Sequence, residues 1–338
     1  MRAMILKAPN EVALESVKRP TPGFGETLIR VSHSGICATD LKIYQGDIPV
    51  DTPRIMGHEA IGVVVEGGTG VTSGAPVIFD PAYHCGGCYT CRAGQPNLCP
   101  NGGLIGRDVD GGFAEYVSVP AHNVHVLPDE IAPAEAPLIQ PMTTCLHAQR
   151  RANIVPGEAV VVMGLGVTGL LHVQLAKAHG AYPVIGITRS RWKLDLAEEL
   201  GADLSLLPDR HAKKRVLDAT DGRGADLVIE SVGRLSVLAQ AIDLARIGGR
   251  LLGFGIYTET TGVLPFHDLY FKELDLIGAR AAKARDFPAC IEMVRRGVVA
   301  LKPLISHTLP LDEMDRALRL LDSGESNRMK IILNHAGH

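Results

Sequence analysis

The chain has 338 residues, enough for two ordinary domains, and its 46% hydrophobic and 21% charged residues are typical of a globular protein. The net charge of −3, without a basic patch, argues against a nucleic acid partner. No apolar run approaches the ~18 residues of a membrane span, and no signal core precedes the first predicted strand, so we expect a cytoplasmic protein with no membrane partner. The seven cysteines should then be reduced, which favours metal ligation over disulfides.

The first half of the chain is predicted to form an irregular, β-rich domain. Glycine and proline are frequent there, and the β-like runs between them are short. The expected strands are Met4–Leu6, Thr27–Ser32, Ile61–Val65, Pro76–Phe79 and Tyr116–Val119.

Beyond about residue 148, strands and helices alternate, which predicts a parallel sheet with helices on both faces. The expected strands are Ala159–Met163, Pro183–Thr188, Asp226–Glu230, Arg250–Phe254 and Leu274–Ile277. The expected helices between them are Val167–His179, Arg191–Leu200 and Leu235–Ala245. The last part of the chain is expected to form helices Phe287–Arg296 and Leu311–Gly324 and a final strand, Lys330–Leu333.

Four cysteines lie within one short segment: Cys85, Cys88, Cys91 and Cys99. Four thiolates at this spacing can surround Zn²⁺ as a tetrahedron and leave no coordination position open, which is typical of a structural site. Interleaved glycines allow the loop to wrap around the ion. Disulfides are the alternative, and a reducing compartment disfavours them. The sequence therefore predicts a structural-zinc lobe at residues 85–99.

A glycine motif connects the apolar strand that ends at Met163 to the helix that follows it. Gly164 allows a tight turn, Gly166 allows the backbone to approach a pyrophosphate, and Gly169 allows close packing of helix and sheet. With Val167, the first residue of the helix, they form the predicted phosphate-binding turn, since free N–H groups there attract an anion. A turn of this kind without a ligand is the alternative.

The end of the second strand of this predicted fold selects the cofactor. NAD sites usually carry an acidic residue there, but this chain has Thr188, which does not repel a 2′-phosphate. Arg189, Ser190, Arg191 and Lys193 are possible phosphate donors. Basic residues are unfavourable at a helix N-terminus, so they indicate a bound anion, although a solvated basic surface is the alternative. We therefore favour NADP(H) over NAD(H).

Several motifs in the order found here resemble those of the zinc-dependent medium-chain dehydrogenases over essentially the whole chain. These are Gly35–Asp40 (GICATD), Gly57–Glu59 (GHE), the four-cysteine segment, Asp110–Tyr116 (DGGFAEY) and the glycine motif. The resemblance implies a GroES-like β-rich catalytic domain, residues 1–147 and 286–338, and a doubly wound Rossmann cofactor domain, residues 148–285. It also implies a homodimer or homotetramer and two Zn²⁺ ions per chain, one structural and one catalytic.

The resemblance also assigns roles at the catalytic metal. It implies that Cys37 and His58 ligate a catalytic zinc and that Glu59 either ligates it or lies just behind it. Zinc with an open position acts as a Lewis acid that lowers the pKa of an alcohol, which can then give up a hydride to the nicotinamide. The Thr39 hydroxyl is expected to accept the alcohol proton and pass it on.

Two positions depart from the pattern of this family, and one at the end of the chain follows it. Lys42 stands where relatives often have a histidine that ends the proton relay, and a lysine is a poor shuttle at neutral pH. Gln140 replaces the glutamate of polyol dehydrogenases, and nearby Cys145 is expected to be a buried helix residue rather than its substitute. Lys330 is expected near the cofactor pyrophosphate.

We therefore expect a zinc-dependent NAD(P)-dependent alcohol or polyol dehydrogenase. Its substrate is expected to be a small secondary alcohol, a polyol or sugar alcohol, or the matching ketone. The alternatives are a dehydrogenase or ketone reductase for apolar secondary alcohols, and a non-catalytic NADPH-binding protein.

Overall fold

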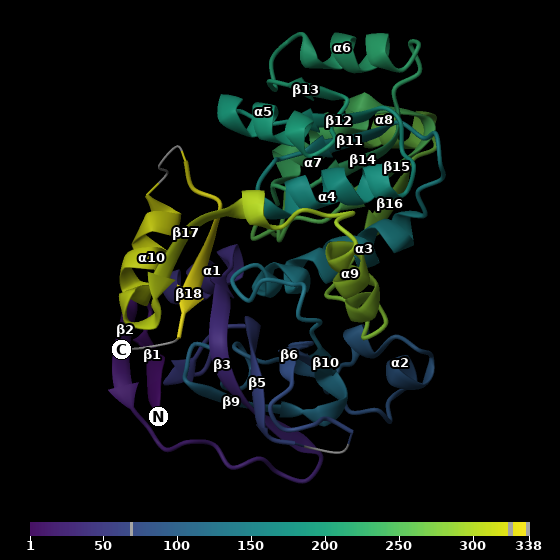
Figure 1. Ribbon diagram of the computed structural model, residues 1–338. Coiled ribbons are helices and arrows are strands. Elements are labelled where there is room, and N and C mark those ends of the chain that lie inside the picture. Colours follow the sequence, from purple (N-terminus) through teal and green to yellow (C-terminus); the bar gives the residue numbers. More distant parts are fainter. Residues whose placement is uncertain (68–69, 324–326, 336–338) are drawn as a thin grey trace. The chain divides into compact units, whose positions relative to one another are not determined.

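The computed structural model describes residues 1–67, 70–323 and 327–335, and its contacts divide the chain into two units (Figure 1). Unit 1 comprises Met1–Thr143, Ala281–Gly297 and Leu301–His338. Unit 2 comprises Thr144–Arg280 and Val298–Ala300. Among the helices described, none is both long enough and apolar enough to cross a membrane.

Unit 1 is built from β-strands that are mostly antiparallel. A seven-stranded sheet contains β10 (Val124–Val126), β6 (Pro76–Phe79), β5 (Glu59–Glu66), β3 (Glu26–Ile36), β18 (Lys330–Asn334) and β17 (Ile305–Pro310) in that order, with β9 (Tyr116–Pro120) also paired to β3. A second sheet has the order β2 (Glu11–Ser16), β1 (Arg2–Ala8) and β4 (Arg54–Ile55), and β7 (Ala82–Tyr83) pairs with β8 (Gly103–Leu104). Strand β18 lies beside β3, so the end of the chain is part of the central sheet.

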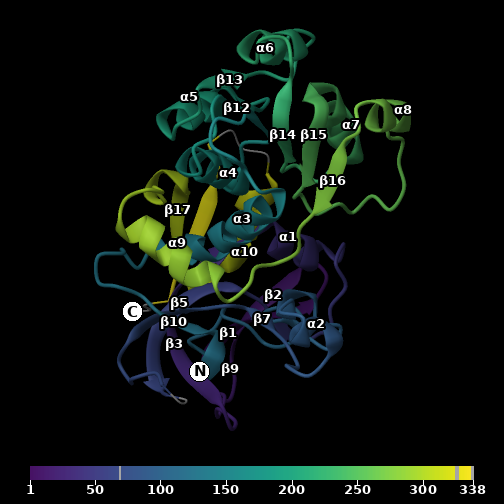
Figure 2. The same cartoon turned by 90° about the vertical axis from the view of Figure 1, so that its right-hand side faces the viewer.

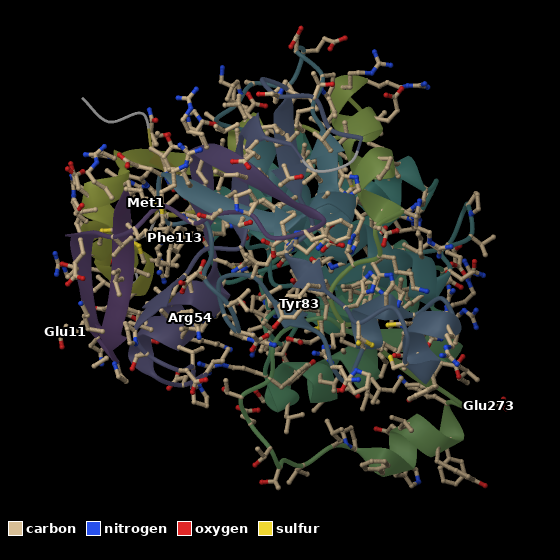
Figure 3. All side chains as sticks on the ribbon, turned by 90° about the horizontal axis from the view of Figure 1, so that it is seen from below. Met1, Glu11, Arg54, Tyr83, Phe113 and Glu273 are labelled. Atoms are coloured by element: carbon tan, nitrogen blue, oxygen red, sulfur yellow. The ribbon has the colours of Figure 1, made fainter. Side chains whose placement is uncertain are left out.

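Helices close the sheets of unit 1 only at their margins. These helices are α1 (Ala38–Gln45), α2 (Tyr89–Arg92), α9 (Asp286–Arg295) and α10 (Met314–Asp322), with 3₁₀ turns η1 (Pro96–Leu98), η2 (Ala121–Asn123), η3 (Ala136–Leu138), η4 (Lys302–Leu304) and η5 (Leu311–Glu313). The core under β1 includes Phe113, which Figure 3 labels near Met1, together with Met314 and Leu318 of α10. Met4 N–H donates to the Phe113 carbonyl over 2.9 Å, which ties β1 to this core.

Unit 2 is a doubly wound α/β unit. Its parallel sheet has the order β13 (Leu204–Leu206), β12 (Val184–Ile187), β11 (Val160–Met163), β14 (Ala225–Glu230), β15 (Ala245–Gly253) and β16 (Asp275–Gly278), the arrangement of a dinucleotide-binding fold. The helices are α4 (Val167–Ala178), α5 (Arg191–Glu199), α6 (Ala212–Ala219), α7 (Leu235–Leu244) and α8 (Phe266–Phe271), while α3 (Ile139–Ala152) runs from unit 1 into unit 2. Figure 2 shows β14, β15 and β16 side by side. Strand β11 is buried throughout, as a central parallel strand must be.

Of two predicted elements at the end of the chain, one differs from the structure at its start. The predicted helix from Leu311 begins as the 3₁₀ turn η5 and becomes α-helical only at Met314. Its expected end, Gly324, lies outside the described residues. The strand expected from Lys330 begins there.

Asp80 is a buried carboxyl group that follows β6. Its side chain accepts a hydrogen bond from Ala82 N–H (2.9 Å), and the residue is only 7% exposed. Burial raises the pKa of Asp80 to about 7; the Ala82 N–H opposes this rise and the nearby Asp286 carboxylate adds to it. Because the pKa is higher in the folded state, this group stabilises the fold fully below the unfolded pKa of ~4, and the contribution is lost as pH rises through about 7.

We therefore expect Asp80→Asn to stabilise the fold, relative to the wild type, increasingly as pH rises, because the amide carries no charge that burial would have to desolvate. The difference in unfolding free energy between the variant and the wild type should grow by roughly 2 kcal/mol from pH 5.5 to pH 8. Urea unfolding at both pH values measures this difference. The same substitution at exposed Asp51 is the control and should give no such trend. A constant difference for Asp80→Asn would contradict the prediction.

Candidate active site

The three side chains predicted to hold a catalytic zinc lie together in unit 1. One ligand atom each from Cys37, His58 and Glu59 lies within 4.8 Å of the others. Cys37 follows the end of β3 and Glu59 begins β5, and these antiparallel strands place Gly35 opposite Glu59. A Cβ atom at residue 35 would lie 2.3 Å from Glu59 Oε2, so only glycine leaves room for this carboxylate.

Asp40 is a site residue that the sequence analysis did not single out. It is fully buried in the first turn of α1, and its Oδ2 accepts a hydrogen bond from Cys37 N–H (2.8 Å). Its Oδ1 lies 3.3 Å from His58 Nδ1, which leaves the Nε2 atom of this ring for a metal. Burial lowers the pKa of His58, but the Asp40 carboxylate and Cys37 together raise it well above its usual value.

Lys330 is a buried lysine that contacts the predicted ligand Glu59. It is 4% exposed at the start of β18, and its Nζ donates to Glu59 Oε2 (2.6 Å) and to the Ile36 carbonyl (3.1 Å). Pairing of β18 with β3 directs the side chain at this carboxylate, and the expected contact with the cofactor pyrophosphate stays a prediction. Burial lowers the pKa of Lys330, but Glu59 and then Cys37 raise it above its usual value, which keeps the ammonium charged.

The charges of this cluster fit a divalent cation. The carboxylates of Asp40 and Glu59 and a Cys37 thiolate would bring three negative charges, against one positive charge on Lys330, so Zn²⁺ would make the buried group neutral. Glu59 Oε1 is buried and accepts no hydrogen bond from the described residues. The donor set, with thiolate, imidazole and carboxylate, is one that zinc prefers.

Two other predicted residues are positioned near this cluster. Thr39 Oγ1 lies 3.6 Å from Cys37 Sγ, so its hydroxyl is within reach of the sulfur. Gln140 is 8% exposed in the first turn of α3, directly after η3, which contacts both β3 and β5. Cys145 is fully buried on the same helix, and its Sγ lies 3.6 Å from the Thr168 carbonyl oxygen.

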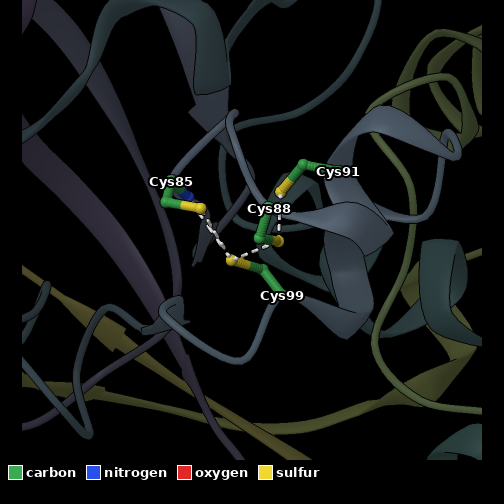
Figure 4. A group of neighbouring side chains, drawn as sticks. All are labelled: Cys85, Cys88, Cys91 and Cys99. Atoms are coloured by element: carbon green, nitrogen blue, oxygen red, sulfur yellow. Dashed lines mark hydrogen bonds between the residues drawn. The ribbon is translucent and has the colours of Figure 1, made fainter.

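The four cysteines of the lobe also gather around one point (Figure 4). Their Sγ atoms lie within 4.8 Å of one another, and the sulfurs of Cys88 and Cys99 are 3.7 Å apart. A tetrahedron with Zn–S bonds of ~2.3 Å has S–S edges of ~3.8 Å, so the site fits zinc. The Thr90 hydroxyl and then the Cys91 N–H lower the pKa of Cys88 to about 6, which favours the thiolate that a metal requires.

The glycine motif of unit 2 forms an open turn between β11 and α4. Gly164 has φ +90°, and a Cβ at Gly169 would lie 1.8 Å from the Gly164 carbonyl oxygen, so both positions require glycine. A Cβ at Gly166, in contrast, would meet no atom within 4 Å, which leaves space over the backbone for a ligand. Gly166 is the N-cap of α4, no side chain caps this helix, and Val167 begins it. The turn can therefore hold a phosphate.

The residues predicted to read the adenosine ribose lie beside this turn. The Gly164 N–H donates to the Ile187 carbonyl (2.8 Å), which places Thr188, the next residue, at the same edge of the sheet. Ser190 is the N-cap of α5, and the first turn of this helix has no acidic residue. Arg189 is exposed, and no ion pair with a carboxylate is formed by it within the described part of the chain. Lys193 lies over the Trp192 ring, 5.3 Å from its centre.

Two family models match the two parts of the chain. The model described as alcohol dehydrogenase GroES-like domain matches residues 23–129, and the model described as zinc-binding dehydrogenase matches residues 167–296. A sorbitol dehydrogenase from Halalkalibacterium halodurans is 33% identical over 327 residues, covering 95% of each chain. The chain belongs to the zinc-dependent medium-chain dehydrogenase/reductase family, and the predicted GroES-like and Rossmann fold classes are confirmed.

Other relatives differ in the alcohol that their names specify. An L-threonine 3-dehydrogenase from Pyrococcus abyssi is 35% identical, with 95% of this chain and 94% of the relative covered. An erythritol/L-threitol dehydrogenase from Mycolicibacterium smegmatis is 34% identical, with 98% and 97% covered. The chain is thus an oxidoreductase of the alcohol and polyol dehydrogenase family.

Solved structures of this fold contain either nicotinamide cofactor. A zinc-binding dehydrogenase from Sinorhizobium meliloti 1021 bound to NADP has a TM-score of 0.91 at 32% identity, with 98% of each chain covered. An alcohol dehydrogenase, rspB, from Escherichia coli CFT073 in complex with NADH has a TM-score of 0.92 at 31% identity, with 99% of each chain covered. Similarity alone therefore does not select the cofactor.

Proposed function

We propose that this chain transfers a hydride between a secondary alcohol, a polyol or sugar alcohol, and NADP⁺, with one catalytic and one structural zinc. The observation that carries this proposal is the cluster of half-buried Cys37 with buried His58 and Glu59, whose charge a divalent cation would balance. The relatives named for sorbitol and for erythritol or L-threitol support a polyol as substrate.

The residues around this cluster have distinct roles in the proposed reaction. Cys37 and His58, with Glu59 as a ligand or just behind it, would hold zinc, which would supply the Lewis acid that makes the alcohol proton acidic. Asp40 fixes the orientation of the His58 ring, and Lys330 holds one oxygen of Glu59. The Thr39 hydroxyl, which can donate and accept, takes the proton from the substrate.

The cofactor preference is argued from the end of β12. Thr188 leaves this position without a negative charge, while exposed Arg189 and the uncapped start of α5 offer donors to a 2′-phosphate. Gly164, Gly166, Val167 and Gly169 would hold the pyrophosphate of either cofactor. We therefore propose that NADP(H) is preferred, with Ser190 and Lys193 as further contacts of its phosphate.

Initial rates with a panel of polyols and apolar secondary alcohols, each with NAD⁺ and NADP⁺, test the proposal. Turnover of polyols with NADP⁺ preferred is the expected result. Preference for apolar alcohols would favour the reductase alternative. Tight NADPH binding without turnover, in protein that holds two zinc ions, would favour a non-catalytic NADPH-binding protein.

We expect Thr188→Asp to reverse the cofactor preference. A carboxylate at the end of β12 repels the 2′-phosphate and can accept hydrogen bonds from both ribose hydroxyls of NAD⁺. The ratio of kcat/KM for NADP⁺ to that for NAD⁺ should fall by roughly 100-fold, equivalent to ~2.7 kcal/mol. Thr188→Asn has the same shape without the charge and should change the ratio far less. An unchanged ratio in Thr188→Asp would place the ribose elsewhere.

The edge of the sheet in unit 2 supports a homodimer or homotetramer. Strand β16 pairs with β15 alone among the strands described, so its other edge carries free backbone groups. Apolar side chains are exposed around it, namely Leu276 (50%), Ile247 (74%) and Phe271 (66%). We propose that a second copy of this chain covers this edge. A monomer mass measured by light scattering at micromolar protein concentration would overturn the proposal of a homodimer or homotetramer.

A further inference from the structure

Glu230 is a buried carboxylate that none of the proposed catalytic steps uses. It ends β14 and has no exposed surface. Its Oε1 accepts hydrogen bonds from the N–H groups of Val232 and Gly233, both 2.9 Å long. Its Oε2 accepts from the Tyr257 hydroxyl (2.5 Å) and, over 3.1 Å, from Gly233 N–H. A buried carboxylate with this many donors fixes the short loop Ser231–Gly233 in one conformation.

This loop packs directly on the glycine turn. Strand β14 pairs with β11 so that Glu230 lies opposite Met163, the residue before the turn. Ser231 N–H donates to the Met163 carbonyl (2.9 Å), and the hydroxyls of Ser231 and Thr168 lie 2.9 Å apart. A Cβ at Gly164 would lie 2.6 Å from Val232 Cγ2, so this valine covers the turn itself.

The loop after β15 supports the same arrangement from the other side. The N–H groups of Phe254 and Gly255 both donate to the Glu230 carbonyl, over 2.9 and 3.0 Å. A Cβ at Gly255 would lie 2.1 Å from the Gly233 nitrogen, so the two loops touch through glycine backbones. Beyond Gly255, the hydroxyl of Tyr257 donates its hydrogen bond to the Glu230 carboxylate. Burial, and then the Glu230 hydrogen bond and charge, raise the pKa of Tyr257, so its hydroxyl remains a donor.

The strand order tells which half of a dinucleotide these loops would face. In this fold the ligand crosses the carboxyl edge of the sheet where the order reverses, here between β11 and β14. Thr188, at the end of β12, lies on the adenosine side of this point, so the loops after β14 and β15 lie on the nicotinamide side. This step rests on the proposed cofactor function.

We propose that Glu230 and Tyr257 are positioning residues for the nicotinamide nucleotide half of the cofactor. They do not touch the cofactor; they hold the backbone of Ser231–Gly233 against the glycine turn, where it forms one wall of the binding crevice. Loss of this wall should weaken binding of a whole dinucleotide and leave binding of its adenosine fragment unchanged.

Calorimetric titration of the full-length, zinc-loaded chain tests this separation. The ligands are NADPH and NADH as dinucleotides, and 2′,5′-ADP and ADP as adenosine fragments. In Glu230→Gln, an amide replaces one accepting oxygen, and in Tyr257→Phe one donor is lost. We expect the Kd of the preferred dinucleotide to rise roughly tenfold in Glu230→Gln and less in Tyr257→Phe, because an unmatched buried polar group is costly. The Kd of the fragment should stay within about twofold.

Glu158→Gln is the matched control, because Glu158 accepts a hydrogen bond from Val155 N–H (2.9 Å) just before β11, at the amino end of the sheet and outside this network. It should leave both Kd values unchanged. Equal weakening of dinucleotide and fragment, or no weakening in either variant, would overturn the positioning role while the proposed function stands. A wild-type chain that binds fragment and dinucleotide with the same affinity would overturn the inference as well. No binding of any nucleotide by the wild type would overturn both the inference and the proposed function.

Discussion

His58→Ala is expected to abolish turnover and to remove one zinc ion per chain while leaving the other in place. The imidazole is one of the predicted ligands. Without it only the Cys37 thiolate and the Glu59 carboxylate remain, and Glu59 already pairs with the Lys330 ammonium. The activity should fall by at least ~1,000-fold, because the Lewis acid that makes the alcohol proton acidic is lost. Metal analysis and initial rates on the same preparation measure both effects.

Two further variants distinguish loss of the metal from loss of the contact that orients the His58 ring, and from the loss of any histidine. Asp40→Asn keeps all three ligands and changes only the carboxylate that faces His58 Nδ1 and Cys37 N–H, so a ~10- to 100-fold loss is expected. His267→Ala removes an exposed histidine whose side chain is 77% accessible, and should change neither zinc content nor rate. Calorimetric binding of the reduced cofactor should be preserved in His58→Ala, since the glycine turn belongs to unit 2. Normal turnover in His58→Ala would refute the zinc mechanism.

The sequence predicted ligands that lie in short motifs and missed partners that come from distant strands. The lobe cysteines were predicted from residue type and local spacing, whereas Cys37 and His58 were predicted from the resemblance of their short motifs to those of a known family. Lys330 and Glu59 are 271 residues apart, and only pairing of β18 with β3 brings them together. No local pattern carries that information. Asp40 could have been recognised, because an acidic residue three positions after a helix N-cap commonly bonds back to the cap.

The same distinction holds for the elements of the fold. Strand β11 and helix α4 were predicted because apolar periodicity and the glycine motif agree there. Helix α3 was expected only at Cys145, without bounds, and Pro141 and two threonines interrupt a helical pattern there, although proline is tolerated in a first helical turn. Strand β13 has three residues, Leu204–Leu206, too few for any periodicity. Its place in the sheet is fixed by its neighbour β12.

We expect the second large effect when the metal of the lobe is lost, and it should lower the stability of the fold rather than the rate of the reaction. Its regular structure, within residues 85–99, consists of the four residues of α2 and the three of η1, and the two-residue strands β7 and β8 flank it. Tyr89, its largest apolar side chain, is 79% exposed. So little buried surface cannot hold a loop of this length in place, and the four thiols, all free of disulfides, form a convergent group of possible metal ligands there. A metal would then supply the stability of this lobe.

We therefore expect Cys99→Ser to release the lobe zinc and unfold the segment locally. The free energy of unfolding should fall by at least ~3 kcal/mol, and trypsin should cleave after exposed Arg92 much faster than in the wild type. Cys145→Ser is the matched control, because this buried thiol lies outside both cysteine clusters and a serine hydroxyl can also donate to the Thr168 carbonyl. It should keep both zinc ions and the slow cleavage. If Cys99→Ser also retains two zinc ions and resists trypsin, then burial alone orders the lobe and its cysteines are not ligands.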